Sequence, residues 1–538
     1  MKRKITSLFL ILFLGFGFCL NAQNTASTTP RDWHMMDYQQ DHVYGISIEK
    51  AYQELLKNKK SAPVVVAIID SGIDTLHEDL KSVIWHNPRE KVNGLDNDHD
   101  GYVEDIFGWN FIGSKDPSKN VTKDTEEALR VYYKDKDKFA NITSEDQLSK
   151  KDRALFREWQ RSKVAVLQLS KEQKSINMLM NAQKLYNEYN PFFQKELNKE
   201  TYTVTDLKAY QTKDEEKSVM QRNYISMFRI AKKDTTNSLL NSRIAFMIDS
   251  LKPLVKLPET PIVNYRDEIV GDNYSDLSDR YYGNNNVMGG DHRHGTHVAG
   301  IIGAARNNGV GMNGIADNVK IMMIRAVPDG DEHDKDIALA IRYAVDHGAK
   351  VINMSFGKPF SPEQKWVEEA FRYAAKKDVL IVKAAGNDSK NIDVEPSFPT
   401  TRYMKGDKKA PNVLTIGASG ATMKTLIAPF SNYGKTMVDV FAPGVRIYST
   451  IPGNKTYSPM SGTSMASPVV AGLAAVLRSY FPNLSAVQIK QVIEDSVVKI
   501  TEQVRKPGST EQVSMTELCR TGGIVNAYNA IKLAEEKK

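Results

Sequence analysis

The sequence predicts an α/β fold built on a doubly wound parallel sheet. Short apolar runs rich in β-branched residues recur along the chain, and stretches with a helical pattern alternate with them. The runs are continuous rather than alternating, which indicates strands that helices cover on both faces. We expect helices at 334–347 and 362–376, and strands at 64–69, 319–324, 350–354, 379–383 and 413–418.

Polar side chains follow three of these runs. Asp70 comes directly after the first run, and Ser355 and Asn387 follow two later ones. In open α/β sheets, ligands bind outside the carboxyl ends of the strands. We therefore expect these three residues at one edge of the sheet.

Residues 114–270 contain no glycine, although the chain has 33, and are rich in Lys, Glu, Gln, Leu and Met. This composition predicts a mainly helical insertion. Its amphipathic helices are expected to pack on one another or on the sheet domain, because apolar residues recur at roughly helical spacing: Leu155, Trp159, Val166, Leu169, Ile176 and Met180. Disorder is the alternative, since the charge is high.

The first 22 residues are typical of a secretory signal. Basic residues precede an apolar run at 5–20, and small residues follow it, so we expect cleavage after Ala22. A membrane anchor is the alternative, but the run is short for a span. Lipid attachment at Cys19 is disfavoured by the bulky Phe18 before it. The expected location is secreted or periplasmic, with residues 23–60 as an N-terminal arm.

Composition excludes several other classes of protein. Cleavage after Ala22 leaves Cys519 as the only cysteine, so no intramolecular disulfide can form. No later segment is apolar and long enough to cross a bilayer, so no membrane contact is expected of the mature form. The net charge of +7 is spread over 72 basic and 65 acidic side chains, which gives no sign of nucleic-acid binding.

A serine-rich segment at 461–468 leads into an apolar helix. A serine at a helix N-terminus lies beside free backbone N–H groups, which suit the negative oxygen formed when a hydroxyl attacks a carbonyl. A helix-capping serine is the alternative. These local features do not choose among the four serines at 458, 461, 464 and 467.

Three histidines cluster at 292, 294 and 297. His294 and His297 would share one helical face and could bind zinc, but the His-Glu-x-x-His arrangement is absent. A general base is the better interpretation. Asn387 ends a strand of small residues and can donate two hydrogen bonds, although a turn asparagine would look the same.

The segments around His294, Asn387 and Ser464 resemble those of the subtilisin-like serine peptidases in order and content. The same holds for Asp70-Ser71-Gly72, 353–357 and 441–444, and the resemblance covers about 61–113 and 271–500. The resemblance implies a three-layer subtilisin-like fold and serine endopeptidase activity without a catalytic cofactor. It makes Ser464 the nucleophile, His294 its base and Asp70 the carboxylate that orients the imidazole. Asn387 and the Ser464 backbone N–H would hold the oxyanion.

The resemblance also assigns the surroundings of the site. His292 and His297 become structural, and polypeptides are the expected substrates. A catalytic domain would comprise 61–113 and 271–538, interrupted by the insertion at 114–270. The substrate channel, with a broad preference for apolar side chains before the cut, would be lined by Ser355, Phe356, Gly357, Ala384, Ala385 and Gly386.

An acidic segment precedes Gly101, with carboxylates at alternate positions as in the first half of a calcium loop. The candidate ligands for a structural Ca²⁺ are Asp96, Asp98, Asp100 and Glu104. Phe107 stands where a calcium loop of the EF-hand type has its closing glutamate. A solvated acidic turn is the alternative.

The insertion separates Asp70 from His294 by far more residues than in compact relatives. Such a length is tolerable, because closure entropy grows slowly. Residues 23–61 are few for a folding propeptide, so we hypothesise that the insertion has a folding or gating role and covers the cleft. Two other functions stay open: a scaffold in which the insertion blocks catalysis, and a metal-dependent hydrolase centred on His294 and His297.

Overall fold

The computed structural model describes residues 29–229, 235–257, 263–406 and 408–537. The expected signal peptide at 1–22 lies outside this range. Within it, no helix combines the length and apolar character that a membrane crossing requires.

The described residues form a nine-stranded sheet in the order β10-β13-β7-β6-β5-β4-β1-β3-β2. Every neighbouring pair is parallel except β10 with β13. The five expected strands are all present with ends within one residue of the prediction. The strands are β1 (Val64–Asp70), β2 (Gly108–Asn110), β3 (Val319–Arg325), β4 (Val351–Met354), β5 (Leu380–Ala384), β6 (Val413–Ser419), β7 (Val440–Pro443), β10 (Val498–Lys499) and β13 (Gly523–Ile524).

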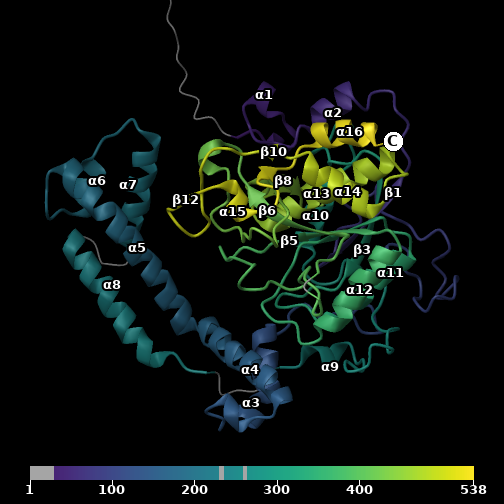
Figure 1. Cartoon of the computed structure of the whole chain (residues 1–538), viewed down its shortest axis with the longest axis horizontal. Helices are drawn as coiled ribbons and strands as arrows, with labels where there is room; N and C mark the ends of the chain where they lie inside the picture. Colours follow the sequence, from purple (N-terminus) through teal and green to yellow (C-terminus); the bar gives the residue numbers. More distant parts are fainter. Residues whose placement is uncertain (1–28, 230–234, 258–262, 407, 538) are drawn as a thin grey trace, which may run out of the picture.

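Helices cover both faces of the sheet, which confirms the three-layer architecture (Figure 1). One layer comprises α10 (Arg293–Gly303), α13 (Thr463–Tyr480), α14 (Ala486–Asp495) and α16 (Ala527–Glu536). The other comprises α11 (Asp334–Asp346) and α12 (Gln364–Lys376). Strand β1 contributes alternate side chains to the two layers: Val66 and Ile68 pack with the first, and Ala67 and Ile69 with the second.

The N-terminal segment packs on the first helical layer. Its elements are η1 (Trp33–Met35), α1 (Tyr38–Asp41) and α2 (Ile48–Glu54). Trp33 and Ile48 are buried in the same apolar cluster as α13, and the Trp33 indole N–H donates to the Val445 carbonyl at 3.2 Å. Smaller elements complete this side: η4 (Met423–Thr425), β8 (Ile447–Thr450), β9 (Tyr457–Met460), β11 (Val504–Arg505), β12 (Gln512–Val513) and α15 (Met515–Leu518).

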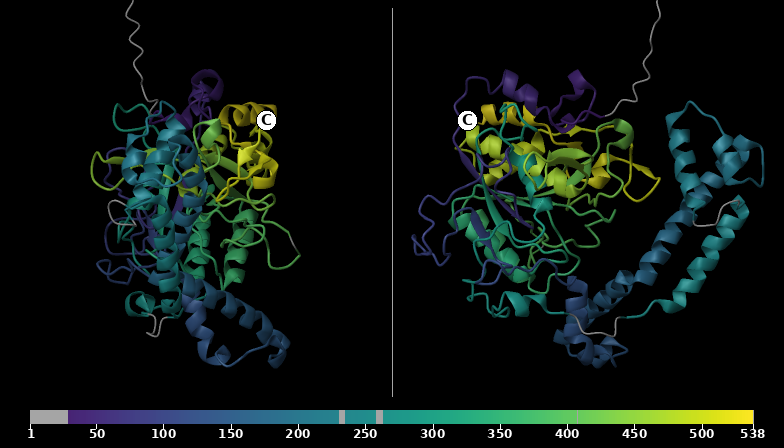
Figure 2. Two further views of the ribbon diagram at one scale, coloured as in Figure 1. Left: turned by 90° about the vertical axis from the view of Figure 1, so that its left-hand side faces the viewer. Right: turned by 180° about the vertical axis from the view of Figure 1, so that it is seen from behind.

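The glycine-free segment forms helices that project from the sheet domain as an arm (Figure 2). They are α3 (Glu127–Phe139), η2 (Glu145–Gln147), α4 (Lys150–Leu169), α5 (Lys171–Leu197), α6 (Val204–Ala209), α7 (Glu215–Met227), α8 (Asn237–Leu251) and η3 (Lys252–Leu254). The last helix of the segment, α9 (Tyr265–Ile269), packs instead on the sheet domain beside α11 and α12. One apolar cluster joins α3 to α4, and a second joins α5 to α8. Midway along α5, the ammonium of Lys184 donates to the Gly508 carbonyl of the sheet domain at 3.4 Å.

The buried face of these helices differs in part from the expected one. Trp159, Val166 and Ile176 are buried, as the pattern predicts. Leu155 and Met180 are 38% and 55% exposed, and the neighbouring Phe156 and Leu179 take the buried positions. In both α4 and α5, two adjacent apolar residues could each have been buried. The contact with the neighbouring helix decides which of the two is buried.

Candidate active site

Strand β1 and helix α10 bring Asp70 and His294 together. Asp70 is the last residue of β1, and His294 lies in the first turn of α10. The close approach requires Gly295, because a Cβ there would lie 2.1 Å from the Gly72 carbonyl oxygen. Asp70 Oδ1 accepts a hydrogen bond from His294 Nδ1 at 2.7 Å across 224 residues of sequence.

This contact sets the protonation chemistry of the imidazole. Burial favours the neutral ring, but the charge of Asp70 and its hydrogen bond outweigh burial and raise the pKa of His294 above its ordinary value. With the proton held on Nδ1, Nε2 is left as the basic atom. The side chain of His294 remains 34% exposed, so a substrate can reach it.

Ser464 is the second residue of α13, and the residue that caps this helix is Gly462. The capping alternative for Ser464 is therefore wrong. The Ser464 hydroxyl donates to the Ser355 carbonyl at 3.0 Å, and the Ser355 hydroxyl donates to the Ser464 carbonyl at 3.0 Å. Asn353 in turn donates to the Ser355 hydroxyl at 2.9 Å. This reciprocal pair ties the start of α13 to the end of β4.

Two hydrogen-bond donors converge beside Ser464. The amide oxygen of Asn387 accepts from the backbone N–H and the hydroxyl of Thr463, at 2.9 and 3.0 Å, which leaves its NH₂ group free to donate. Asn387 Nδ2 and the Ser464 backbone nitrogen both lie 3.6 Å from the point that a Cβ on Gly462 would occupy. An anionic oxygen in that space could therefore accept from both groups.

The other two histidines make structural contacts. The His297 ring is buried, its Nε2 lies 3.0 Å from the Ser458 carbonyl oxygen, and burial lowers its pKa to about 4. His292 Nδ1 lies 3.2 Å from the Gly290 carbonyl oxygen. Over the described ranges, the groups of side chains that could hold a metal ion include none of these histidines.

A cavity of about 850 Å³ surrounds Ser464 and Asn387. Five of the six channel residues line it, whereas Ala385 is fully buried in the core behind it. The cavity has a further wall that sequence reasoning missed, formed by insertion residues and by the loop after β3. Its members include Glu126, Ala128, Arg161, Ala165, Leu169, Asp331 and Glu332. No motif in the sequence marks them, because they meet the cleft only through folding.

The acidic segment forms a closed loop on the surface. Both carboxylate oxygens of Asp96 accept backbone N–H bonds, from Asp100 at 3.2 Å and from Gly101 at 2.8 Å. One oxygen of Asp98 lies 3.1 Å from Arg89. The other is buried without a hydrogen-bond partner among the described residues. Glu104 turns away and accepts from the Gly94 N–H.

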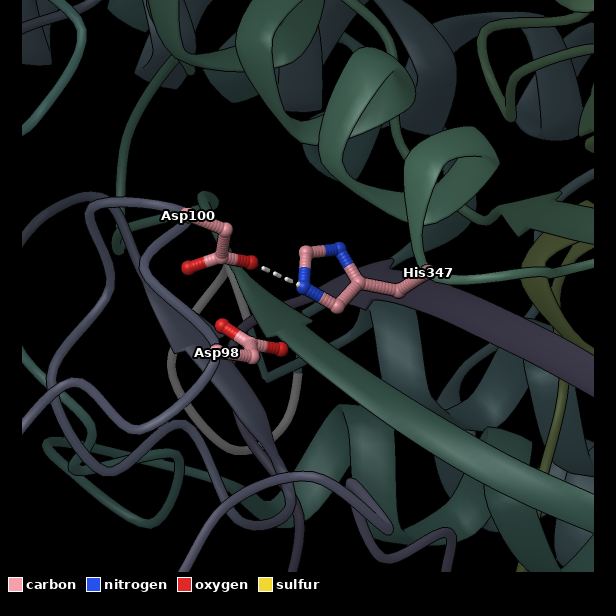
Figure 3. A group of neighbouring side chains, drawn as sticks. All are labelled: Asp98, Asp100 and His347. Carbon is pink, nitrogen blue, oxygen red and sulfur yellow. Dashed lines mark hydrogen bonds and ion pairs between the residues drawn. The ribbon is translucent and has the colours of Figure 1, made fainter.

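Two residues join these carboxylates that the sequence pattern did not indicate. Glu90 groups with Asp96 and Asp98, and His347 groups with Asp98 and Asp100 (Figure 3). His347 Nε2 lies 2.7 Å from Asp100 Oδ2. Burial of this ring favours its neutral form, but hydrogen bonds to Asp100 and Asp105 outweigh that effect and raise the pKa of His347 to about 10.

Comparisons of the sequence with known proteins find similarity to serine proteases. A model of the subtilase family matches residues 61–516. The chain is 43% identical to a thermophilic serine proteinase of Bacillus sp. (strain AK1) over 44% of this chain and 52% of the relative. It is 36% identical to a cell wall-associated protease of Bacillus subtilis (strain 168), over 48% of this chain and 27% of the relative.

Thermitase of Thermoactinomyces vulgaris is 34% identical over 49% of this chain and 85% of its own. A solved mutant of the protease domain of PatA is 27% identical with a TM-score of 0.37, and covers 46% of this chain and 82% of its own. The matched region spans about half of the thermophilic serine proteinase and less of the cell wall-associated protease. The extent of the family match shows that the chain belongs to the subtilase family.

Proposed function

We propose that this chain is a serine endopeptidase that hydrolyses peptide bonds through an acyl-enzyme on Ser464. The observation that carries the proposal is the 2.7 Å hydrogen bond between Asp70 and His294, in a chain whose Ser464 and Asn387 line one cavity. The presence of Asp70, His294, Asn387 and Ser464 in one chain argues against a scaffold, which would need none of them.

The first step transfers the Ser464 proton to His294. The hydroxyl leaves the Ser355 carbonyl by rotation about the Cα–Cβ bond, and His294 Nε2 takes its proton as Oγ attacks the scissile carbonyl carbon. Asp70 holds the tautomer that makes Nε2 the base, and it stabilises the imidazolium that forms.

The carbonyl oxygen becomes an anion in this step and enters the space beside Gly462. Asn387 Nδ2 and the Ser464 backbone N–H donate to it there. His294 then gives its proton to the leaving amine, which departs with the C-terminal part of the substrate. Water then gives a proton to His294 Nε2 as it attacks the acyl carbon. The bond from that carbon to Ser464 Oγ breaks, Oγ takes the proton back from His294, and the N-terminal part of the substrate leaves as a carboxylic acid.

Polypeptides in an extended conformation are the proposed substrates. Ser355, Phe356 and Gly357 form one wall of the channel, and Ala384 and Gly386 form another. Small residues predominate on these walls, which supports a broad preference for apolar side chains before the cut. Residues 1–22 and the cell wall-associated relative support a secreted or periplasmic location.

We also propose that the acidic loop holds a structural Ca²⁺. The residues fit a hard cation, because oxygen ligands from Glu90, Asp96 and Asp98 lie within 4.8 Å of one another. The buried, unpartnered oxygen of Asp98 points to a ligand. Bound there, Ca²⁺ would neutralise the loop carboxylates and take no part in the chemistry at Ser464.

A fluorophosphonate probe tests the proposed activity directly. We expect a covalent adduct on Ser464, no adduct in Ser464→Ala, and normal labelling in Ser461→Ala, whose hydroxyl is a surface acceptor for the Arg446 N–H. Cooperative unfolding of each variant shows that it is folded. A folded wild type with no adduct supports the scaffold alternative, and hydrolysis that chelators abolish without any adduct supports the metal-dependent one.

A further inference from the structure

Three side chains from distant parts of the chain meet at the end of helix α11. His347 is the residue that caps the C-terminus of α11, and Asp98 and Asp100 belong to the acidic loop between β1 and β2. One ligand atom of each side chain lies within 4.8 Å of the other two (Figure 3). An imidazole nitrogen together with carboxylate oxygens is a ligand set that suits a divalent transition metal such as Zn²⁺.

The imidazole of His347 is held in a fixed orientation. Its ring stacks on Tyr343, with the ring centres 3.9 Å apart, and its side chain is 3% exposed. Nδ1 donates to the Tyr343 carbonyl at 2.8 Å, so Nε2 is the atom that faces the carboxylates. Histidines that bind metal ions usually donate their second ring nitrogen to a carbonyl or carboxylate in this way. Nε2 is therefore oriented as a metal ligand would be.

The carboxylate of Asp98 has an oxygen that lacks a partner. Its side chain is 3% exposed, and one oxygen lies 3.1 Å from the Arg89 guanidinium. The other oxygen, Oδ1, is buried and has no hydrogen-bond partner among the described residues. Figure 3 shows the carboxylate turned toward Asp100 and the His347 ring. Because a buried polar atom without a partner is costly, this oxygen points to a bound ligand.

The groups around His347 carry an excess of negative charge. Asp105 is fully buried, and one of its oxygens lies 3.2 Å from His347 Nε2. Asp98, Asp100 and Asp105 thus surround one imidazole, and over the described residues their one further ion pair is that of Asp98 with Arg89. Even a protonated imidazole leaves one negative charge uncompensated. A divalent ion on the neutral ring would balance the group, and the ring proton would leave to solvent.

A small movement would complete the coordination. Two ligands of a tetrahedral Zn²⁺, each about 2.0–2.1 Å from the ion, lie roughly 3.3 Å apart. His347 Nε2 and Asp100 Oδ2 are 2.7 Å apart, so Asp100 has to move outward by a fraction of an ångström. The Asp100 side chain is 23% exposed, which leaves room for that shift. We propose that Asp98, Asp100 and His347 form a three-ligand site for Zn²⁺ or a similar transition metal.

This site differs in chemistry from the proposed Ca²⁺ site. Calcium takes oxygen ligands, which Glu90, Asp96 and Asp98 supply, whereas a nitrogen ligand favours Zn²⁺. Asp98 belongs to both groups, but His347 belongs to the second alone. Zinc bound there would tie the acidic loop to the end of α11. None of its three ligands lines the cavity at Ser464, so the ion would act on stability and not on the hydrolytic step.

Titration of the full chain with Zn²⁺ tests the site. A Ser464→Ala background prevents self-cleavage, and a chelator removes metal ions beforehand. We expect calorimetry to find a Zn²⁺ site that His347→Asn weakens by about 100-fold or more, because removal of a group that merely orients a ligand already costs about 10–100-fold. Asp100→Asn removes another ligand and should weaken the site as well. His42→Asn is the matched control, since His42 is an exposed histidine of the N-terminal segment.

Bound Co²⁺ gives a second measurement, because its visible absorption depends on its ligands. His347→Asn should change that spectrum and leave any stabilisation by Ca²⁺ intact. Unchanged Zn²⁺ affinity in His347→Asn and Asp100→Asn, each shown to be folded by cooperative unfolding, would overturn the proposal, as would a wild type that binds no Zn²⁺. If one variant does not fold, the other decides. Equal loss of the Ca²⁺ and Zn²⁺ responses in His347→Asn would mean a single site and would also overturn it, whereas a wild type that Ca²⁺ does not stabilise contradicts the calcium proposal alone.

Discussion

The side-chain oxygen of Asn387 is engaged twice by Thr463, through the backbone N–H at 2.9 Å and the hydroxyl at 3.0 Å. This arrangement turns the NH₂ group of Asn387 toward the space beside Gly462. Thr463 thus acts as a positioning residue for the proposed oxyanion donor.

Replacement of Asn387 by Asp keeps the shape of the side chain and removes the donor. We expect kcat to fall by about 10²–10³ with little change in KM, a magnitude known from subtilisin itself. Steady-state kinetics with a peptide ester measures both constants. Thr463→Ser keeps both hydrogen bonds and should retain most of the activity. A loss confined to KM would show that Asn387 binds substrate rather than the oxyanion.

Gly462→Ala tests the proposed oxyanion site by placing a methyl group in it. The backbone at Gly462 is extended, with φ 161°, so alanine can adopt it. Apart from its two chain neighbours, no residue has an atom closer than 3.6 Å to the added Cβ, so stability should be nearly unchanged. The methyl group would occupy the proposed oxyanion site, and we expect kcat to fall at least about tenfold. Unaltered kcat in the folded variant would place the oxyanion elsewhere.

The pH dependence should follow His294. Its pKa lies above the ordinary value because of Asp70, so the base is protonated and inactive at low pH. We expect kcat/KM for an ester to rise with pH through a midpoint above about 6.5. Asp70→Asn should lower that midpoint and reduce kcat by about 10⁴. Asp291→Asn removes a weaker charge and should lower the midpoint slightly at nearly normal kcat.

Calcium should stabilise the protein without being needed for the chemical step. At a free concentration of 100 Kd, we expect the free energy of unfolding to rise by about 2–3 kcal/mol. Thermal unfolding with and without a chelator measures the effect. Asp98→Asn should abolish it, whereas Asp116→Asn, an exposed carboxylate outside the loop, should not. Identical unfolding curves for the wild type in both conditions would favour the solvated acidic turn.

The buried charges at Lys358 should matter for stability. Burial alone would lower the pKa of Lys358, but Glu127 and Asp334 outweigh it and raise the pKa, so the residue stays charged. Lys358→Met leaves Asp334 without its cation and Glu127 with Arg130 alone, and should cost about 3–5 kcal/mol in urea unfolding. Lys134→Met, at an exposed position of α3, is the control. A small loss for Lys358→Met would mean that the helical arm is not held by this ion pair.

The sheet could be predicted closely from the sequence. Strand β1 is a continuous apolar run up to Asp70, and β6 is apolar except for Thr415 and Ser419; burial on both faces demands this pattern locally. The position of Asp70 at the end of a strand could be predicted in the same way, because it directly follows one of these apolar runs. The choice of His294 over His297 came from family resemblance, and the structure adds a reason: His294 contacts Asp70, whereas the His297 ring lies against the Ser458 carbonyl.

Other features depend on contacts between distant segments. Phe156 rather than Leu155 is buried because α3 packs on that side of α4. His347 joins Asp98 and Asp100 only because α11 ends beside the acidic loop. The residues of α11 give no sign of the acidic loop, and the residues of the loop give no sign of α11. No sequence motif could therefore have predicted this contact.

The sequence by itself determined the strands, the glycine-free helical segment and the triad candidates, because each depends on residues that are neighbours in the chain or on short motifs. Only the tertiary structure decided that Arg161, Ala165 and Leu169 form a wall of the cavity at Ser464. That wall exists because Phe360, which packs in the apolar cluster of α3 and α4, and the buried Lys358 hold the insertion against the cleft. Those contacts join residues hundreds of positions apart, and only the folded chain brings them together.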